Sequence, residues 1–240
     1  VVQIMHGIAE HISRYDDFMA FLASNGFVAV GTDHLGHGKS IEKPEQKGFF
    51  AEKNGWDYII KDEEILRLAM KHTYPGVPFI LFGHSMGTLL AAELIRQART
   101  AGLPTPRHAF MSGRCAPCDG TRMLNADHLS DEDLVQFFAQ GGLSTAIPDT
   151  DPELRRMLNR ILCTDVRMAD RFALTPEEAP FGCDITVLYG KEDHILRNVD
   201  LRGWDRFTGG KCDYFGFSGG HFFFAQHLKE ICGLITERIC

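Results

Sequence analysis

The stretch VPFILFGHSMGTLLAAELI, residues 77–95, decides the fold of this chain. It opens with an unbroken apolar run from Val77 to Phe82, which is typical of a strand buried on both faces of a parallel sheet. A serine bracketed by glycines follows, in Gly83-His84-Ser85-Met86-Gly87, and a helical pattern with little polar surface runs from Thr88 to Ala101. Strand, serine and helix together match the G-x-S-x-G nucleophile elbow, so Ser85 is the candidate nucleophile.

The tightness of such an elbow explains why its serine needs glycine neighbours. Only small residues fit two positions before and after the serine, whose backbone is strained. The turn lifts the Ser85 hydroxyl above the sheet and places it at a helix N-terminus, where a developing negative charge is favoured. The alternative, a glycine-rich turn with an idle serine, is disfavoured by the buried strand and buried helix on either side.

Short apolar runs alternate with helical patterns along the rest of the chain. The expected strands are Val1–Met5, Phe27–Thr32, Val77–Phe82, His108–Ser112, Ile185–Tyr189 and Tyr214–Phe217. The expected helices are Arg14–Asn25, Asp57–His72, Thr88–Ala101 and Phe222–Arg238. Strands separated by helices predict an α/β fold, a mostly parallel sheet with helices on both faces. The length of 240 residues suits one domain covering residues 1–240.

The stretch from about Asp119 to Pro180 breaks this alternation. Ser130 is a plausible helix N-cap with Asp133 three residues on, and Pro152 suits the start of a second helix. We predict two to four short helices inserted between the fourth and fifth strands. Ligands bind at the carboxyl ends of parallel strands, so this insert, residues 119–180, is expected to act as a lid.

Four apolar residues of the insert are candidates for contact with the substrate. Its charges leave few contiguous apolar positions that could meet a lipid surface. We therefore expect the larger apolar side chains to form an inward face over the substrate site. These candidate substrate-binding residues are Phe137, Phe138, Met157 and Leu158.

A nucleophilic serine needs a base, and in this elbow architecture the chain order is serine, acid, histidine. The best candidate base is His221, because Ser218-Gly219-Gly220 directly follows the sixth strand and lets a loop carry the imidazole over Ser85. The alternative, His227, falls inside the final expected helix and is read as a surface residue.

The orienting acid should follow the fifth strand. Asp193 is the first choice there and Glu192 the second. Asp193 should orient the imidazole and stabilise its charged form without taking its proton. Asp200 and Asp205 lie farther along and are interpreted as solvated charges.

The oxyanion hole needs two backbone N–H groups. One is expected from Met86, the residue after the nucleophile. The second is expected from Ile8, in the loop that follows the first strand, where Gly7 permits a sharp turn. His6 is interpreted as a structural brace of that loop.

A cluster of histidines raises the alternative of a metal site. His34 and His37 are close in sequence, and His6 and His11 could lie near them. Their spacing fits no zinc motif, and a serine triad needs no metal. We therefore expect a hydrogen-bonded loop beside the active site, with no metal and no cofactor.

The composition of the chain excludes several classes of protein. The chain has 25 Lys+Arg and 32 Asp+Glu, a net charge of −7, and 44% hydrophobic residues, which is ordinary globular composition. The acidic excess argues against a nucleic-acid partner. No apolar run approaches the ~20 residues of a transmembrane helix. No signal peptide precedes the first strand, and because the chain begins with Val1 we expect its true start to be missing.

The chain has 7 cysteines, an odd number with scattered spacing. They are interpreted as reduced thiols, which indicates a cytoplasmic protein. Cys115 and Cys118 have the spacing of a redox or zinc half-site, but no second pair accompanies them, so they are read as loop or core thiols.

Residues 1 to about 90 resemble the monoacylglycerol lipase and lysophospholipase branch of the α/β-hydrolases. The resemblance is carried by HGIAEH at 6–11 with Arg14-Tyr15, by DHLGHGKS at 33–40 and by GHSMG at 83–87. It implies the α/β-hydrolase fold, with the N-terminal strands of that fold missing from this chain.

Residues from about 79 to 240 resemble type II thioesterases of nonribosomal peptide and polyketide synthesis. This resemblance rests on the motifs GHSMG at 83–87 with AAEL at 91–94, GLP at 102–104, PRH at 106–108, SGR at 112–114, LSDEDL at 129–134, GG at 141–142 and GGHFF at 219–223. This resemblance places Ser85, Asp193 and His221 on the family's triad. The oxyanion loop of that family, Pro-His-Ala-Gly-Gly, is replaced here by the lipase-like motif. The chain therefore resembles a crossover of two families at the nucleophile strand.

The resemblance implies a serine hydrolase of acyl esters or thioesters. Its favoured substrate is an acyl thioester on the phosphopantetheine arm of an acyl or peptidyl carrier protein. The reason is that the lid and the loop that carries His221 both resemble those of thioesterases. The alternative is a monoacylglycerol lipase or lysophospholipase. A third alternative, an α/β-hydrolase scaffold kept for binding alone, would need a broken triad, and all three members are present.

Overall fold

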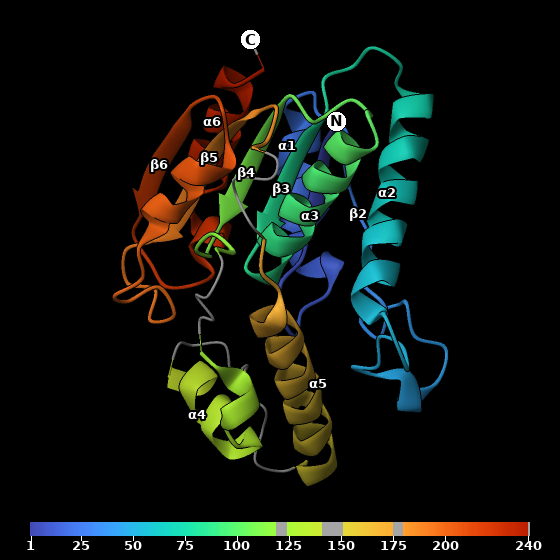
Figure 1. Cartoon of the computed structure of the whole chain (residues 1–240), viewed down its shortest axis with the longest axis vertical. Coiled ribbons are helices and arrows are strands. Elements are labelled where there is room, and N and C mark those ends of the chain that lie inside the picture. The colour runs from blue at the N-terminus through green and yellow to red at the C-terminus, as the bar shows by residue number, and fades with distance from the viewer. Residues whose placement is uncertain (119–123, 141–150, 175–179, 240) are drawn as a thin grey trace.

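The computed structural model describes residues 1–118, 124–140, 151–174 and 180–239. Its centre is a 6-stranded sheet in the order β2-β1-β3-β4-β5-β6, in which every neighbouring pair is parallel (Figure 1). The strands are β1 (Val2–Met5), β2 (Ala29–Gly31), β3 (Ile80–His84), β4 (His108–Ser112), β5 (Asp184–Gly190) and β6 (Cys212–Phe217). The predicted α/β class and parallel sheet are confirmed.

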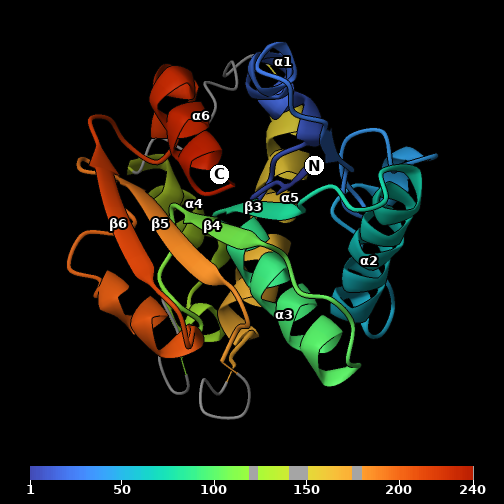
Figure 2. The same ribbon diagram turned by 90° about the horizontal axis from the view of Figure 1, so that it is seen from above.

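Helices cover both faces of this sheet, as Figure 2 shows from above. On one face lie α1 (Asp16–Ser24) and α6 (Leu228–Glu237); on the other lie α2 (Gly55–Thr73) and α3 (Met86–Thr100). The expected final helix is in fact broken into a 3-10 turn, Phe223–Gln226, and α6, with His227 between them.

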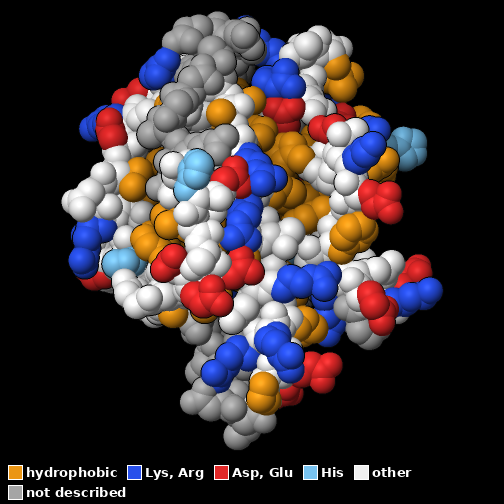
Figure 3. Space-filling model, turned by 60° about the horizontal axis from the view of Figure 1, so that its bottom comes forward, with side chains coloured by type: hydrophobic (Ala, Val, Ile, Leu, Met, Phe, Trp, Pro, Cys, Tyr) orange, Lys and Arg blue, Asp and Glu red, His pale blue; other side chains and the backbone are white. Residues whose placement is uncertain are grey.

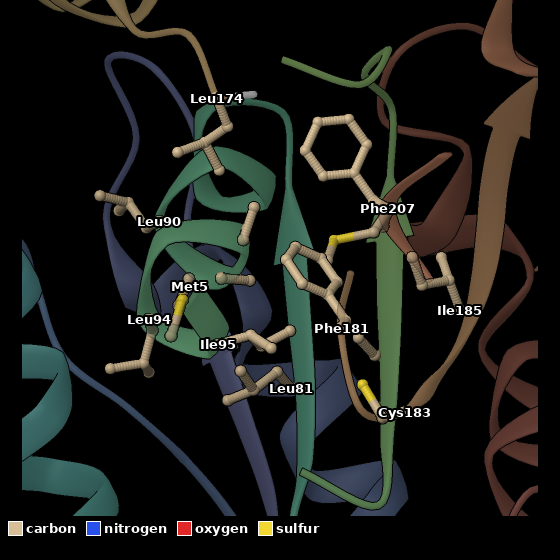
Figure 4. Close-up of a cluster of buried hydrophobic side chains, with 14 of the residues drawn as sticks. Met5, Leu81, Leu90, Leu94, Ile95, Leu174, Phe181, Cys183, Ile185 and Phe207 are labelled. Atoms are coloured by element: carbon tan, nitrogen blue, oxygen red, sulfur yellow. The ribbon is translucent and has the colours of Figure 1, made fainter. Parts of the chain in front are cut away.

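Alternate residues of each buried strand serve two separate cores. Ile80 and Phe82 of β3 belong to the cluster that holds the buried side chains of α1 and α6, whereas Leu81 points to the opposite cluster. Figure 4 shows Leu81 and Met5 facing Leu90 and Ile95 of α3 in that second cluster. Burial on both faces explains why the sequence of this strand is apolar throughout.

The insert between β4 and β5 contains α4 (Asp131–Gln140) and α5 (Pro152–Arg171), which project together beyond one end of the sheet (Figure 1). The Ser130 hydroxyl accepts the Asp133 N–H at 3.1 Å, which confirms the predicted cap. The remaining residues of the predicted lid, 119–123, 141–150 and 175–179, lie outside the described residues.

The expectation that the helices of the insert would be short is wrong for α5, which has 20 residues. Its start is well defined, because Pro152 follows an N-cap, Asp151, whose side chain accepts the Leu154 N–H at 2.9 Å. Its buried positions recur at helical spacing at Ile161, Asp165 and Ala169, so one continuous face packs inward.

The strand order creates a switch point between β1 and β3. From β1 the chain crosses to β2 on one side, and then returns to β3 on the other. Met5 at the end of β1 is paired with Gly83 near the end of β3. Crevices for ligands open at such points, outside the carboxyl ends of the strands. The loops that carry Ile8 and Ser85 therefore meet at this position.

Candidate active site

Ser85 forms the turn between β3 and α3 with φ 53° and ψ −119°, which is a strained conformation for any residue but glycine. The glycines around it allow this turn. A Cβ on Gly83 would fall 2.6 Å from the carbonyl carbon of Gly87, and one on Gly87 would fall 2.7 Å from that of Met5. Both distances are far below van der Waals contact, so the steric explanation of the motif is confirmed.

His221 and Asp193 form a buried pair at the same end of the sheet. Nδ1 of His221 lies 2.7 Å from Oδ2 of Asp193, and the other carboxylate oxygen accepts the N–H of Ile195 at 2.9 Å. A carboxylate can only accept, so the proton sits on Nδ1 and Nε2 is the basic nitrogen. Nε2 is buried and has no hydrogen-bond partner among the described residues.

The imidazole of His221 lies beside the strand end that leads into Ser85. Its ring centroid is 4.8 Å from that of His84, the residue before the serine. No hydrogen bond joins Ser85 to His221 among the described contacts. The structure thus brings the three predicted triad members to one end of the sheet, with the acid and base already in contact.

The second candidate acid, Glu192, contacts the loop that carries His221 and not the imidazole of His221. Its carboxylate accepts the N–H of Gly219, and its own N–H donates to the carbonyl of Gly219 at 3.1 Å. Glu192 therefore braces the loop that carries His221.

The other polar alternatives have separate contacts. Asp200 accepts the Arg202 N–H at the start of a 3-10 turn, and Asp205 accepts the Tyr214 hydroxyl. His227 lies 3.0 Å from the carbonyl of Ser218 through its Nε2.

Two backbone amides near Ser85 are available as donors. The loop after β1 passes against the nucleophile, because a Cβ on Gly7 would lie 2.9 Å from Cβ of Ser85. Neither the Ile8 N–H nor the Met86 N–H donates a hydrogen bond to any residue that the structure describes. Both side chains are buried in one cluster. This arrangement can supply the two donors that an oxyanion requires.

His6 is the predicted brace of that loop. It receives the His34 N–H on Nε2 at 3.0 Å and faces the Gly7 carbonyl with Nδ1 at 3.0 Å, while its ring stacks on His34 at 3.7 Å. Burial, reinforced by the neighbouring histidines, holds the pKa of His6 well below its ordinary value. A neutral ring with a hydrogen-bond contact on each nitrogen fits the structural role of His6.

Two of the four histidines considered for a metal, His34 and His37, are directed at carboxylates. Nδ1 of His34 lies 3.4 Å from Glu63, and Nε2 of His37 lies 2.8 Å from Asp165. Within the described ranges, no three His, Cys, Asp or Glu side chains converge as metal ligands would. The cysteines of those ranges are free thiols.

Sequence reasoning missed Glu10 and Asp165, two buried carboxylates that hold the loop after β1, which carries Ile8. Glu10 accepts the Gly7 N–H at 2.8 Å and the Tyr15 hydroxyl at 2.9 Å, and burial raises its pKa. Asp165 accepts the Ala9 N–H at 2.7 Å. Glu10 stands within the quoted HGIAEH motif, but Asp165 gives no local signal except its place on the buried face of α5.

The predicted substrate-binding residues separate into two pairs. Phe138 is buried in the cluster that also holds Ile8 and Met86, and Phe137 packs against it, with its ring 5.5 Å from that of His194. Met157 and Leu158 are half-buried near the start of α5 and belong to none of the core clusters of the described residues. Contact with a substrate stays a prediction for all four.

A separate pocket of about 510 Å³ lies between α5 and the loop before α2. Its apolar lining includes Phe50, Trp56, Met168 and Phe172. Figure 3 shows hydrophobic side chains gathered in a hollow beside Lys and Arg on this face of the molecule. No member of the predicted triad lines this pocket.

Two family models match the chain and overlap at the elbow. The model of the thioesterase domain matches residues 63–239, and the model described as serine aminopeptidase, S33, matches residues 1–103. The chain belongs to the thioesterase domain family. The overlap contains β3, Ser85 and α3, which confirms the predicted crossover of two families at the nucleophile strand.

Individual relatives include both a thioesterase and a lipase homolog. A probable cadicidin biosynthesis thioesterase of Streptomyces griseus is 31% identical over 164 residues, covering 68% of this chain and 44% of that protein. A monoglyceride lipase homolog of monkeypox virus is 35% identical over 91 residues, covering 38% and 31%.

A solved structure supports the fold of the thioesterase-family chain. The type II thioesterase BorB from the borrelidin biosynthetic cluster matches with a TM-score of 0.71 at 24% identity, covering 100% of this chain and 92% of that one. The fold is the predicted α/β-hydrolase fold, and the chain is an enzyme of the serine hydrolase class. Among the described residues, no helix is long and apolar enough to span a bilayer.

The elbow generates a prediction about stability. Gly87→Ala should lower the free energy of unfolding by roughly 2 kcal/mol or more, because the new Cβ meets backbone that has to shift. The control is Gly233→Ala on the exposed face of α6, where a Cβ meets nothing within 4 Å. That change should raise stability by up to ~1 kcal/mol, since alanine is the better helix former. Equilibrium urea unfolding measures both, and equal effects would contradict the steric account.

The His37–Asp165 pair generates a prediction about pH. Burial lowers the pKa of His37, but the Asp165 carboxylate, the Leu35 carbonyl and, last, Asp33 outweigh this effect, so the pKa is raised above the ordinary value of 6.5. A raised histidine pKa adds stability below the unfolded value, and this stability is lost as pH rises through the folded value.

The stability lost in His37→Gln should therefore be largest near pH 6 and shrink at alkaline pH, roughly above the raised pKa. Unfolding by urea across this range measures the difference. The matched control is His72→Gln on the exposed surface of α2, for which no such trend is expected. A loss that grows with pH would reverse the assigned sign.

Proposed function

We propose that this enzyme hydrolyses acyl thioesters carried on the phosphopantetheine arm of a carrier protein, with Ser85 as nucleophile, His221 as base and Asp193 as orienting acid. The observation that carries the proposal is the buried 2.7 Å contact between His221 and Asp193 at the end of the sheet where the strained Ser85 turn lies. Few arrangements besides a serine triad use a strained serine beside an oriented imidazole with a free ring nitrogen.

The reaction follows from these positions. Nε2 of His221 removes the Ser85 proton as the oxygen attacks the acyl carbon, and Asp193 stabilises the imidazolium. The N–H groups of Ile8 and Met86 donate to the carbonyl oxygen as its charge develops. The imidazolium then protonates the departing thiol, and His221 activates a water that releases the acid from Ser85.

The preference for a thioester rests on the parts that meet the acyl group. The insert and the histidine loop both lie in the region matched by the thioesterase domain model. Of the insert residues that the structure describes, Leu154 alone is a large apolar residue with high exposure. The exposed start of α4 is acidic, at Asp131, Glu132 and Asp133. Such a surface suits a protein-borne arm better than a membrane or micelle.

A second candidate is hydrolysis of a monoacylglycerol or lysophospholipid. It is favoured by the loop that supplies Ile8, since residues 1–103 match the serine aminopeptidase model and a lipase homolog is 35% identical over 91 residues. Both candidates use the same triad, so they differ in the group that leaves and in the surface that delivers it.

The triad assignment predicts a contrast between adjacent acids. Asp193→Asn should lower kcat by about 10⁴-fold, because an amide leaves His221 in the wrong tautomer. Glu192→Gln should lower kcat only slightly, since its amide oxygen can still accept the Gly219 N–H. Ser85→Ala should abolish turnover and labelling by a fluorophosphonate probe while the thermal unfolding temperature stays high. If Glu192→Gln proves the more damaging change, Glu192 is the acid.

The substrate assignment predicts a ratio of rates. The kcat/KM for an acyl-phosphopantetheine thioester on a carrier protein should exceed that for a monoacylglycerol of equal chain length. Both are measured below and above the concentration at which the glyceride forms micelles. A preference for the glyceride that rises as micelles form would overturn the thioesterase proposal and support the lipase.

A further inference from the structure

A single carboxylate joins the helix of the insert to the oxyanion loop. Asp165 lies near the middle of α5 and is fully buried. Its Oδ2 accepts the N–H of Ala9 at 2.7 Å and lies 2.8 Å from Nε2 of His37. Its Oδ1 has no hydrogen-bond partner among the described residues. These two contacts span 156 and 128 residues of sequence.

The charge of this carboxylate is balanced by His37. Nδ1 of His37 lies 2.9 Å from the carbonyl oxygen of Leu35, and Nε2 faces Asp165. Both neighbours are acceptors, so both ring nitrogens must donate and the ring is an imidazolium. A buried carboxylate without such a partner would strongly destabilise the folded state. The contact is therefore an ion pair between α5 and the loop after β2.

The N–H group that donates to Asp165 belongs to a residue with a strained backbone, Ala9. Ala9 has φ +50°, in the left-handed region, which is unfavourable for a residue with a Cβ. The carboxylate bond holds the residue there. On the other side of Ile8, the Gly7 N–H is held by Glu10 at 2.8 Å. The peptide that presents the Ile8 N–H is thus fixed from both ends, once from within its own loop and once from α5.

We propose that Asp165 is a positioning residue for hydrolysis, which orients the Ile8 N–H by docking α5 onto the oxyanion loop. This rests on the proposed function, in which Ile8 donates to the oxyanion. The hole is then complete only when the helix of the insert is seated. The contact also crosses the junction of the two families, because Ala9 and His37 lie only in the region of one family model and Asp165 only in that of the other.

Asp170 provides a matched control on the same helix. It is also buried and also accepts two hydrogen bonds, from the Leu124 N–H at 3.0 Å and the Ala126 N–H at 2.7 Å. Those amides belong to the insert and not to the oxyanion loop. Loss of Asp170 should therefore weaken packing of α5 without moving Ile8.

The test compares Asp165→Ala, Asp165→Asn and Asp170→Ala in the full chain, with rates expressed per folded molecule. Asp165→Ala should lower kcat by about 10²-fold, because a donor displaced by ~1 Å loses most of its effect, while KM changes by less than about threefold. Asp165→Asn should lose less, about tenfold, since its amide oxygen can still accept the Ala9 N–H. Asp170→Ala should change kcat by less than about threefold.

A second readout isolates the oxyanion hole from general stability. An acyl trifluoromethyl ketone adds to the nucleophile as a tetrahedral oxyanion, so its inhibition constant should rise across the variants in parallel with the loss of kcat/KM. A role confined to stability would lower the unfolding temperature of both Asp165→Ala and Asp170→Ala and leave this constant unchanged. If Asp165→Ala does not fold, an unchanged constant in Asp165→Asn overturns the proposal equally.

Failure of the proposed function has a different signature. Wild-type protein would then neither turn over the thioester or the glyceride nor form the ketone adduct at Ser85. An active wild type in which Asp165 and Asp170 variants behave alike overturns the positioning role alone.

Discussion

The end of the sheet that carries Ser85 depends on the contact between Gly87 and the carbonyl group of Met5. A side chain at residue 87 would overlap that carbonyl, so α3 can approach β1 only because the residue is glycine. The same approach brings the loop after β1 against Ser85, where a Cβ on Gly7 would lie 2.9 Å from that of the serine. The strain at Ser85 is tolerated because buried strands on both sides fix the turn.

The remaining parts of the site are added at the same edge by separate strands. The loop after β5 brings Asp193, and the loop after β6 brings His221, with Glu192 and Gly219 joining the two loops by their backbones. Because parallel strands end at one edge, residues far apart in sequence meet without long connections. The insert then closes over Ile8 and Met86 with the apolar face of α4 and α5.

Local patterns were sufficient to predict most of this arrangement. The strand at His108–Ser112 was predicted with the bounds it has, and the three predicted triad residues lie at one end of the sheet. The start of β3 was predicted three residues early, because Val77 is apolar but exposed, and Pro78 cannot donate to a strand ladder. The contact of Asp165 with Ala9 and His37 could not be predicted, since it depends on tertiary packing across 128 residues or more.

The difference between backbone pairing and side-chain contacts explains how two family patterns can share one chain. Pairing between β1, β3 and β4 uses backbone groups, so it tolerates strands from different lineages as long as the register and the buried volume are kept. Side-chain contacts across the junction are not interchangeable in this way. Where α5 meets the loops of the N-terminal half, a buried carboxylate needs partners, and Asp165 contacts the Ala9 N–H and the His37 ring. A chain of this kind is therefore constrained less by its sheet than by the contact between its insert and the loop after β1.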